Sequence, residues 1–295
     1  MYHLPVMLSE SIEGLAIKPG GIYADLTFGG GGHSRAILSK LNDQGRLIAF
    51  DQDEDALNNA IDDERFLLIN QNFRYFRNFL RMHKALPLDG ILADLGVSSH
   101  QIDTPERGFA TRFDGPLDLR MDRNAPFTAE QLLNSYPEEK LKSVFAEYGE
   151  IANARQLAYV ITQSRPLATI AEFKKAIASC IPRKTENKYL AMVFQALRIE
   201  VNDEMGVLKA MLKQTAEALK PGGRLVVIAY HSLEDRLVKN YIRTGNFEGV
   251  PEKDFYGNLQ SPFLAITRKP LTPGAGELES NPRSRSAKLR IAERK

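Results

Sequence analysis

Three aspartates and a run of glycines are the residues of this chain whose types and spacing could do chemistry. Asp25 comes directly before "LTFGGGGH", in which four glycines stand together at 29–32. A run of glycines costs conformational entropy, so it is typical of a backbone that needs positive φ or the close approach of another molecule. Asp51 and Asp94 each close a short apolar segment further along the chain. The combination predicts a site for a nucleotide-like ligand.

The spacing of the glycines distinguishes between several loops of this kind. A phosphate loop needs a Lys after its last glycine, whereas His33 follows here. The dinucleotide pattern G-x-G-x-x-G would start at Gly29 and Gly31 but has Ser34 in its third position. The spacing D-x-x-x-G-x-G, from Asp25, resembles the first motif of Rossmann-like methyltransferases that use S-adenosylmethionine. A glycine-rich turn beside an exposed aspartate is the alternative.

The chemistry of S-adenosylmethionine fits the acidic residues. The cofactor has no pyrophosphate, and it needs an acceptor for its ammonium group and an acid for its ribose hydroxyls. Asp51 ends "LIAFD" twenty residues after Gly31 and is predicted to bind the ribose. Asp94 lies at the carboxyl end of another predicted strand, where ligands bind in open α/β sheets, although it could instead cap the following helix. Methyltransferases that act on exocyclic amines often carry an acidic, Asn or Ser residue followed by Pro-Pro-aromatic at this place. Leu95, Gly96 and Val97 follow Asp94 instead, so the catalytic groups stay unassigned.

Alternating strands and helices must position these residues. Near-continuous apolar runs separated by helix-like segments predict βαβ units and a parallel sheet that is covered on both faces. The predicted strands are residues 21–26, 45–51, 65–70, 88–96 and 224–230, and the predicted helices between them are 34–41, 53–61, 75–86 and 204–219. Residues 262–271 and 286–294 are predicted as two final strands, antiparallel at the sheet edge.

The segment from about 103 to 202 shows a different pattern. It contains no convincing strand, and "TAEQ" and "TIAE" predict capping boxes at Thr128 and Thr169. A further helix is predicted at 137–149, from a Pro to a Gly. The fold class predicted is therefore α/β, a Rossmann-like methyltransferase domain of residues 1–103 and 203–295. A helical insertion of residues 104–202 is expected to recognise the substrate.

Composition sets limits on the type of protein. The 295 residues carry a net charge of +2 and a single cysteine, Cys180, which allows no intramolecular disulfide and no Cys-rich zinc site. The five histidines are scattered, so no metal site is expected. The N-terminus lacks the features of a signal peptide, and no apolar run approaches the ~20 residues that span a bilayer. We therefore expect a cytoplasmic protein without a membrane partner.

Eight segments in order resemble the bacterial ribosomal RNA small-subunit methyltransferase H family, and the resemblance runs from about His3 to the last residues. The segments are "HLPVML", "TFGGGGHSRAIL", "DGILADLGVSSHQID", "RGFA", "DGPLDLRMD", "FQALRIEVNDE", "YHSLEDRLVK" and "NPRSRSAKLRIAER". This family makes N4-methylcytidine in the decoding centre of the small ribosomal subunit. The resemblance implies an enzyme that uses S-adenosylmethionine to methylate 16S ribosomal RNA.

The resemblance also implies cofactor-binding residues. They are a Gly-Gly-His, the ribose-binding acid, an aromatic beside the adenine and two residues of "DLGVSSHQ", which correspond here to Gly31, Gly32, His33, Asp51, Phe73, Asp94 and Gln101. Taken alone, His33 is typical of a helix start that bonds a backbone carbonyl, and Phe73 of the core. Gln101 taken alone indicates no function. The loop containing residues 247–258 is shorter than in some members of the family.

Catalytic and substrate-binding residues are less strongly indicated. Asp94, or a backbone carbonyl of "DLGVSS", is our hypothesis for the acceptor of an N4 proton, and the alternative is that Asp94 binds only the cofactor. His231, Arg283 and Arg285 are candidates for RNA contacts, with a charged edge strand as the alternative for the C-terminal arginines. The basic segment 74–84 could also bind RNA or be a solvated helix face. A nicotinamide-dependent dehydrogenase and a non-catalytic RNA-binding protein are the rival functions. Monomer and dimer both remain open.

Overall fold

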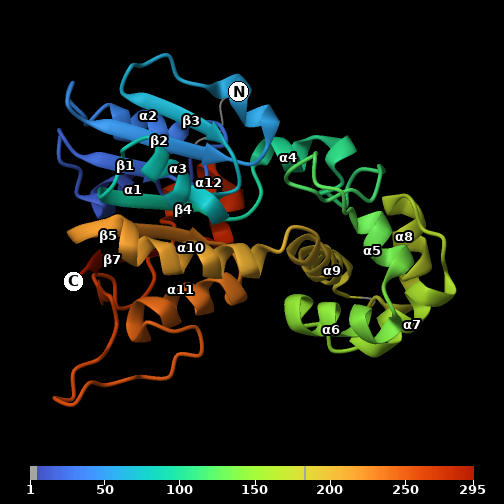
Figure 1. Cartoon of the computed structure of the whole chain (residues 1–295). Helices are drawn as coiled ribbons and strands as arrows, with labels where there is room; N and C mark the ends of the chain where they lie inside the picture. Colours follow the sequence, from blue (N-terminus) through green and yellow to red (C-terminus); the bar gives the residue numbers. More distant parts are fainter. Residues whose placement is uncertain (1–4, 183) are drawn as a thin grey trace. The chain divides into compact units, whose positions relative to one another are not determined.

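The chain forms two compact units, each with its own core. The computed structural model describes residues 5–182 and 184–295 (Figure 1). One unit consists of residues 1–96 and 206–295, and the other of residues 97–205. The sequence placed the ends of the helical segment at 104 and 202. Its role in substrate recognition stays a prediction.

A seven-stranded sheet forms the centre of the first unit, in the order β3-β2-β1-β4-β5-β7-β6 (Figure 1). Strands β1 to β5 are parallel, and β7 runs antiparallel to both β5 and β6. Their bounds are Ile22–Asp25 (β1), Arg46–Asp51 (β2), Phe66–Asn70 (β3), Leu88–Asp94 (β4), Leu219–Ala229 (β5), Phe263–Ala265 (β6) and Lys288–Arg294 (β7). The parallel strands with an antiparallel pair at one edge confirm the predicted α/β, Rossmann-like class.

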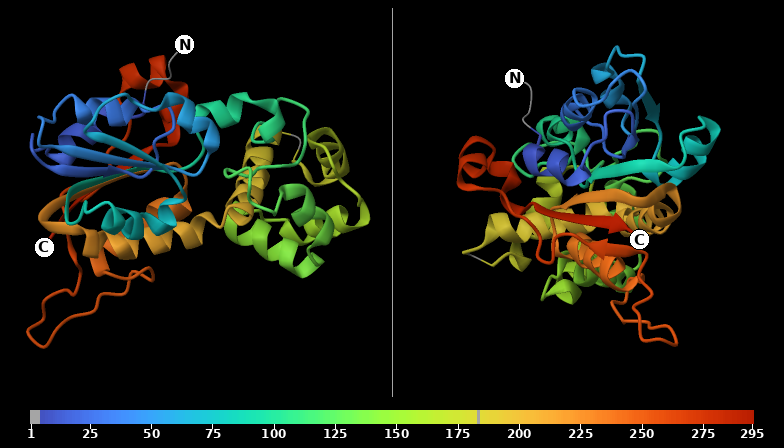
Figure 2. Two further views of the ribbon diagram at one scale, coloured as in Figure 1. Left: turned by 45° about the horizontal axis from the view of Figure 1, so that its top comes forward. Right: turned by 90° about the vertical axis from the view of Figure 1, so that its left-hand side faces the viewer.

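Helices cover both faces of this sheet, as the buried runs of its strands require. Leu15 of α1 (Leu8–Leu15) and Ile37 of α2 (Gly32–Leu38) belong to the core on one face. Leu80 of α3 (Phe76–Met82), Met211 of α10 (Glu204–Ala218) and Val238 of α11 (Ser232–Thr244) belong to the core on the other. Figure 2 shows the two helical layers on either side of the strands. The short helix α12 (Ala275–Ser280) lies near the N-terminal segment, because Glu277 Oε1 accepts a hydrogen bond of 2.7 Å from the Met7 backbone.

Three predicted elements differ from the structure. Residues Glu54–Asn59 form a 3₁₀ helix, η1, instead of an α-helix, and Ala56 is its one buried residue. With so little packing, nothing drives the segment to extend into an α-helix. Strand β5 starts at Leu219, earlier than expected, and β6 has only three residues. In addition, no helix was predicted from the sequence at Leu8–Leu15, where the structure has α1.

The second unit is helical, as the sequence pattern predicted. Its helices are α4 (Ser99–Asp103), α5 (Ala129–Ser135), α6 (Glu138–Gly149), α7 (Ala154–Gln163), α8 (Ile170–Ala176) and α9 (Glu186–Val201), with 3₁₀ turns η3 (Pro105–Arg107) and η4 (Ala178–Cys180). No strand lies among its described residues, 97–182 and 184–205. The capping boxes predicted at Thr128 and Thr169 are both present. Pro137 stands one place earlier than expected, as the N-cap of α6.

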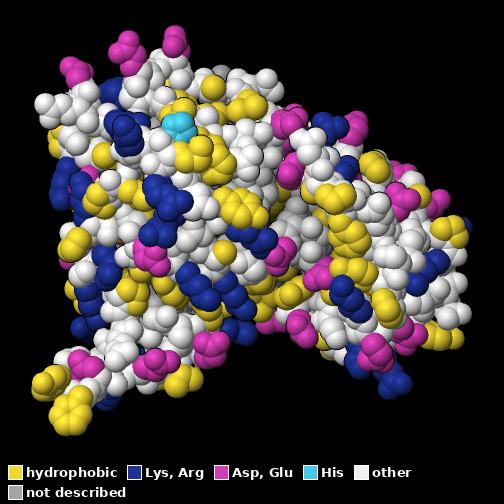
Figure 3. Space-filling view, in the orientation of Figure 1, with side chains coloured by type: hydrophobic (Ala, Val, Ile, Leu, Met, Phe, Trp, Pro, Cys, Tyr) yellow, Lys and Arg dark blue, Asp and Glu magenta, His cyan; other side chains and the backbone are white. Residues whose placement is uncertain are grey.

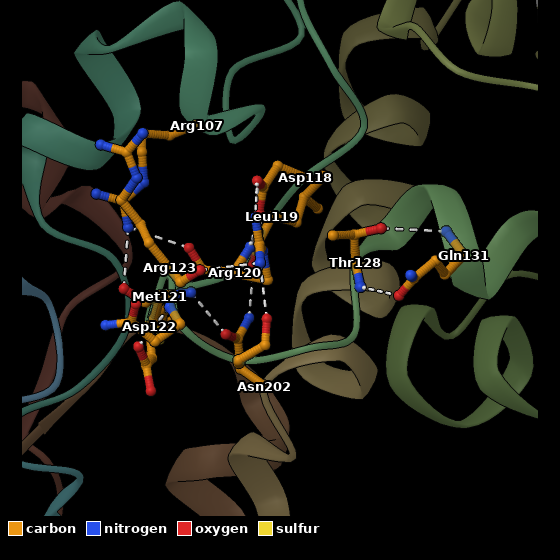
Figure 4. Close-up of polar contacts among 12 residues, drawn as sticks. Arg107, Asp118, Leu119, Arg120, Met121, Asp122, Arg123, Thr128, Gln131 and Asn202 are labelled. Carbon is orange, nitrogen blue, oxygen red and sulfur yellow. Dashed lines mark hydrogen bonds and ion pairs between the residues drawn. The ribbon is translucent and has the colours of Figure 1, made fainter.

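The segment 118–123 of this unit is fixed by side chains from distant positions (Figure 4). Arg107 is buried and donates hydrogen bonds to the carbonyls of Arg120 (3.0 Å) and Met121 (2.9 Å). Asn202 accepts from the Met121 N–H (2.7 Å) and donates to the Leu119 carbonyl (2.8 Å). Leu119 has φ of +58°, which is unfavourable for a residue with a side chain. The two polar side chains therefore hold a backbone turn that would otherwise be disfavoured.

Candidate active site

Three acidic side chains meet at the carboxyl edge of the parallel sheet. Asp25, Asp51 and Asp94 are the last residues of β1, β2 and β4, which are neighbours in the sheet. The order of the strands reverses between β1 and β4. In open α/β sheets, ligands bind in the crevice outside the carboxyl ends at such a point. The topology therefore brings the predicted acidic residues to the place where a ligand is expected.

The glycine loop connects β1 to α2 and is left-handed at two positions. Gly29 has φ of +50° and Gly31 has φ of +74°. A Cβ on Gly31 would come within 2.9 Å of the Phe28 ring, and one on Gly32 within 2.8 Å of Pro5. A Cβ on Gly29 or Gly30 would meet no atom within 4 Å. Gly31 and Gly32 are therefore required by the packing of the loop, whereas Gly29 and Gly30 border open space.

Asp51 holds the loop from the next strand. Its Oδ2 accepts a hydrogen bond of 2.8 Å from the Gly29 N–H, and its Oδ1 accepts one of 2.9 Å from the Asp53 N–H. Burial raises the pKa of this carboxyl to about 6, although the two backbone donors favour its ionised form. Asn70 at the end of β3 donates to the Asp51 carbonyl (3.0 Å). Asp51, the acid predicted to bind a ribose, is thus hydrogen-bonded to the glycine loop.

Asp25 is buried and forms hydrogen bonds with residues on either side of the glycine loop. The residue is 1% exposed, and its carboxylate accepts from the Ser34 hydroxyl (2.7 Å) and from the Thr27 N–H (3.1 Å). Burial is the main cause that raises its pKa. Since Ser34 lies in α2, the Asp25 carboxylate ties the start of that helix to the end of β1. Its burial makes Asp25 a structural residue of the loop.

Asp94 stands in a network with two other side chains. The hydroxyl of Tyr230 lies 2.8 Å from its Oδ1, and Nδ1 of His33 lies 3.9 Å from its Oδ2. Nε2 of His33 lies 3.0 Å from the Val6 carbonyl and donates to it, as the sequence reading of a helix-start histidine suggested. The Asp94 N–H donates to the Thr27 hydroxyl (2.7 Å). Burial raises the pKa of Asp94 to about 6.

Phe73 and Gln101 lie in different units. Phe73 begins the 3₁₀ turn η2 (Phe73–Tyr75) after β3, and its partly buried ring packs against the core under the sheet. Gln101 lies in α4 of the second unit. Its Oε1 accepts from the Ser98 N–H (3.0 Å), and its own N–H donates to the Ser98 hydroxyl (3.2 Å). This capping box is a local structural role that the sequence reading did not assign to Gln101.

His231 has a local structural role at the start of α11. Its Nδ1 accepts from the Glu234 N–H (3.4 Å), and its Nε2 lies 3.2 Å from Glu234 Oε1. The Glu234 carboxylate accepts in return from the Tyr230 N–H (2.9 Å) and the His231 N–H (3.3 Å). His231 is therefore the N-cap of the helix. Its contact with RNA stays a prediction.

The basic clusters are only partly available to a partner. Arg290 and Lys288 of the C-terminal strand lie 2.6 and 3.7 Å from the Asp235 carboxylate. Arg283 and Arg285 lie in the 3₁₀ turn η5 (Pro282–Ser286), and Arg285 is exposed.

On the face of the sheet that α10 and α11 cover, Arg77 of α3 pairs with Glu217 (2.8 Å), whereas Arg81 and Lys84 are exposed. Figure 3 shows Lys and Arg side chains gathered over the face of the first unit that carries α3 and α10.

The comparison with protein families identifies the class to which this protein belongs. The model of the MraW methylase family matches residues 1–295. The chain belongs to the MraW methylase family. Membership confirms the predicted methyltransferase and its cofactor, S-adenosylmethionine, and it decides against the dehydrogenase alternative. No helix of the described residues has the length and apolar character that crossing a bilayer requires.

Several known proteins are similar to this chain along its whole length. The ribosomal RNA small subunit methyltransferase H of Bacteroides thetaiotaomicron is 57% identical over 297 residues, which cover 100% of this chain and 98% of the relative. The protein of the same name from Flavobacterium johnsoniae is 56% identical and is covered to 98%. A solved structure of an rRNA methylase from Streptococcus thermophilus is 14% identical, covers 100% of this chain and 98% of its own, and has a TM-score of 0.44.

Tyr230 was missed by the sequence reading. It follows the last residue of β5, so the strand order places it at the same edge as Asp94. Of the segment "YHSLEDRLVK", only His231 was predicted to belong to the site. The available signal was its position as the last residue of the predicted strand 224–230, since Asp51 also ends a predicted strand.

Proposed function

We propose that this protein transfers the methyl group of S-adenosylmethionine to N4 of a specific cytidine in the decoding centre of 16S ribosomal RNA, within the small ribosomal subunit. The relatives named ribosomal RNA small subunit methyltransferase H, which match across the full chain, support the RNA and the subunit. The observation that carries the proposal is the open face of the glycine loop between Asp51 and Asp94.

The cofactor is proposed to lie along the carboxyl edge of β1, β2 and β4. Asp51 accepts from the ribose hydroxyls, because its two oxygens keep acceptor capacity beyond the bonds from Gly29 and Asp53. The methionine part passes the open side of Gly29 and Gly30, and Asp94 accepts from its ammonium group. Phe73 contacts the adenine, and Gln101 is the remaining proposed contact.

Gly31, Gly32 and His33 contribute mainly through the shape of the loop. Gly31 and Gly32 allow the close packing on Phe28 and Pro5 that a side chain would prevent. One nitrogen of His33 is engaged by the Val6 carbonyl and the other faces Asp94. These three residues therefore hold the loop and the Asp94 carboxylate in place for the cofactor.

The reaction forms a bond between N4 and the methyl carbon and breaks the bond from that carbon to sulfur, which leaves S-adenosylhomocysteine. The lone pair of N4 is delocalised into the ring, so the amine must be held in line with the methyl group. Positioning of this kind contributes ~7–11 kcal/mol to lowering a barrier. The nitrogen then loses a proton. Asp94 is the proposed acceptor, and the alternative is that Asp94 binds only the cofactor.

The RNA is proposed to contact both units. A cytidine inside folded RNA must be extruded to reach the methyl group. The exposed Arg285, with Arg283 and His231, is proposed to bind the flanking backbone on one side of the site. The helical unit is proposed to recognise the surrounding RNA.

Methyl transfer from labelled S-adenosylmethionine tests the proposal. Small ribosomal subunits and free 16S RNA, both from cells that lack this gene, are incubated with the protein, and the digested nucleosides are identified by mass spectrometry. The proposal predicts N4-methylcytidine. Label on carbon 5 of cytosine, or on another base, would contradict the assignment to N4. Absence of transfer to either substrate would favour the non-catalytic RNA-binding alternative.

A further inference from the structure

We propose that Tyr230 is a positioning residue for Asp94. The Tyr230 hydroxyl holds the Asp94 carboxylate in the orientation and charge state that binds the cofactor. The proposal rests on the proposed contact between Asp94 and S-adenosylmethionine. Tyr230 belongs neither to the glycine loop nor to the residues proposed to bind the ribose.

The backbone around both residues is fixed by the sheet. The Leu95 N–H, one residue after Asp94, donates to the Ile228 carbonyl of β5 (3.0 Å), which joins the ends of the two strands. The Tyr230 N–H donates to Glu234 in the first turn of α11 (2.9 Å). Gly96, with φ of +96°, lies against the ring, since a Cβ there would stand 3.6 Å from Tyr230 Cδ2. The phenol is therefore aimed at Asp94 by its surroundings.

The hydroxyl occupies one oxygen of Asp94 and leaves the group accessible. It lies 2.8 Å from Oδ1, while Oδ2 faces His33 Nδ1 at 3.9 Å. The side chain of Asp94 remains 21% exposed, whereas that of His33 is 6% exposed. A ligand with a positive charge can thus reach the carboxylate of Asp94 but not the imidazole behind it.

Opposing influences act on the charge of Asp94. Burial and the neighbouring carboxylates of Asp25 and Glu234 favour its neutral form, whereas His33 and the Tyr230 hydroxyl favour the ionised form. The balance raises the pKa of Asp94 to about 6. Removing the hydroxyl removes one of the two groups that favour ionisation, so the pKa rises further. Cofactor binding that needs an ionised Asp94 then weakens at a higher pH.

The variant Tyr230→Phe tests this role, because it keeps the ring and removes only the hydroxyl. Dissociation constants for S-adenosylmethionine are measured by calorimetry at pH 8 and at pH 6. Loss of a hydrogen bond to a charged group moves a pKa by about one unit. The variant is therefore expected to bind within about twofold of the wild type at pH 8 and about fivefold more weakly at pH 6. Tyr23→Phe is the matched control, since Tyr23 is a buried tyrosine whose hydroxyl accepts from the Lys18 N–H (2.7 Å).

A second variant changes the hydrogen bond in the opposite direction. A 3,5-difluorotyrosine at position 230 is a stronger donor than tyrosine, so the difference in affinity between pH 6 and pH 8 is expected to shrink. Equal weakening of Tyr230→Phe at both pH values would show a purely structural role and overturn the proposal. Unchanged affinity at both values would overturn it as well.

Asp94→Asn separates failure of this inference from failure of the site assignment. If Asp94→Asn binds the cofactor as tightly as the wild type, Asp94 does not contact it and both statements fall. If Asp94→Asn binds weakly while Tyr230→Phe shows no dependence on pH, only the positioning role of Tyr230 is wrong.

Discussion

Asp51 Oδ2 and the backbone N–H of Gly29 are joined by a hydrogen bond of 2.8 Å. The acid that ends β2 and the loop that follows β1 therefore form one structural unit. A cofactor whose ribose bonds to Asp51 and whose methionine part passes Gly29 would contact both ends of this unit. The loop is held in place before the cofactor arrives, which lowers the entropic cost of binding.

Replacement of Asp51 is expected to weaken cofactor binding strongly. Asp51→Ala removes the acceptor for the ribose hydroxyls and the partner of Gly29. Hydrogen bonds to charged groups contribute about 1.5–3 kcal/mol, so a loss of about 10- to 100-fold in affinity is expected by calorimetry. Asp62→Ala, in an exposed position before β3, is the control. Binding of Asp51→Ala within about twofold of the wild type would contradict the ribose assignment.

Asp94→Asn is expected to stabilise the unliganded protein at neutral pH. The folded pKa of about 6 lies above the ordinary value, so the folded state binds the proton more tightly than the unfolded state. Stability from this group is therefore present below pH 4 and is lost as pH rises from about 4 to about 6. A neutral Asn avoids this loss, which corresponds to about 1–3 kcal/mol at pH 7.5.

Chemical denaturation at two pH values checks this expectation. The variant should exceed the wild type in free energy of unfolding at pH 7.5 and match it near pH 3, where most of the wild-type carboxyl is protonated in both states. The opposite order, with the variant less stable only at pH 7.5, would mean that the ionised carboxylate stabilises the fold.

The glycines of the loop are expected to respond differently to an added methyl group. Gly30→Ala places a Cβ in open space without positive φ, so the melting temperature should stay within about 2 °C of the wild type. Gly31→Ala combines φ of +74° with a 2.9 Å approach to Phe28 and should unfold at lower temperature. If the cofactor lies over the open side, Gly30→Ala also loses affinity for it. Full affinity in this variant would place the cofactor elsewhere.

Asn202→Ala is expected to destabilise the helical unit. The substitution removes the hydrogen bonds of Asn202 with the Met121 N–H and the Leu119 carbonyl, next to the left-handed Leu119. Each buried group left unsatisfied costs about 1–3 kcal/mol. Urea denaturation should show a loss of about 2–4 kcal/mol, whereas the exposed Asn124→Ala should change little. Equal stability of the two variants would show that the turn is held by Arg107 alone.

Local sequence patterns predicted the parts of the fold that depend on neighbouring residues. Asp25, Asp51 and Asp94 end neighbouring strands and lie at the carboxyl edge of the sheet. This position follows from the sequence because alternating strands and helices produce parallel strands, whose carboxyl ends lie at one edge. The capping boxes at Thr128 and Thr169 also form, since they need only four residues.

Contacts between distant residues could not be predicted in this way. Tyr230 and Asp94 are 136 positions apart, and Asn202 and Met121 are 81 apart. No periodicity relates such pairs, so only the three-dimensional structure shows that they touch. The same holds for the burial of Asp25, which turns an apparent ligand-binding acid into a structural one.

The proposed N4-methylation is tested most directly by comparing 16S ribosomal RNA from cells that lack the gene with RNA from cells in which the gene is restored. Nuclease fragments covering the decoding centre are measured by mass spectrometry, with Asp51→Ala as the inactive control. We expect one cytidine to lose its N4-methyl group in the deletion and to regain it with the wild-type gene only. An unchanged methylation pattern in the deletion would contradict it.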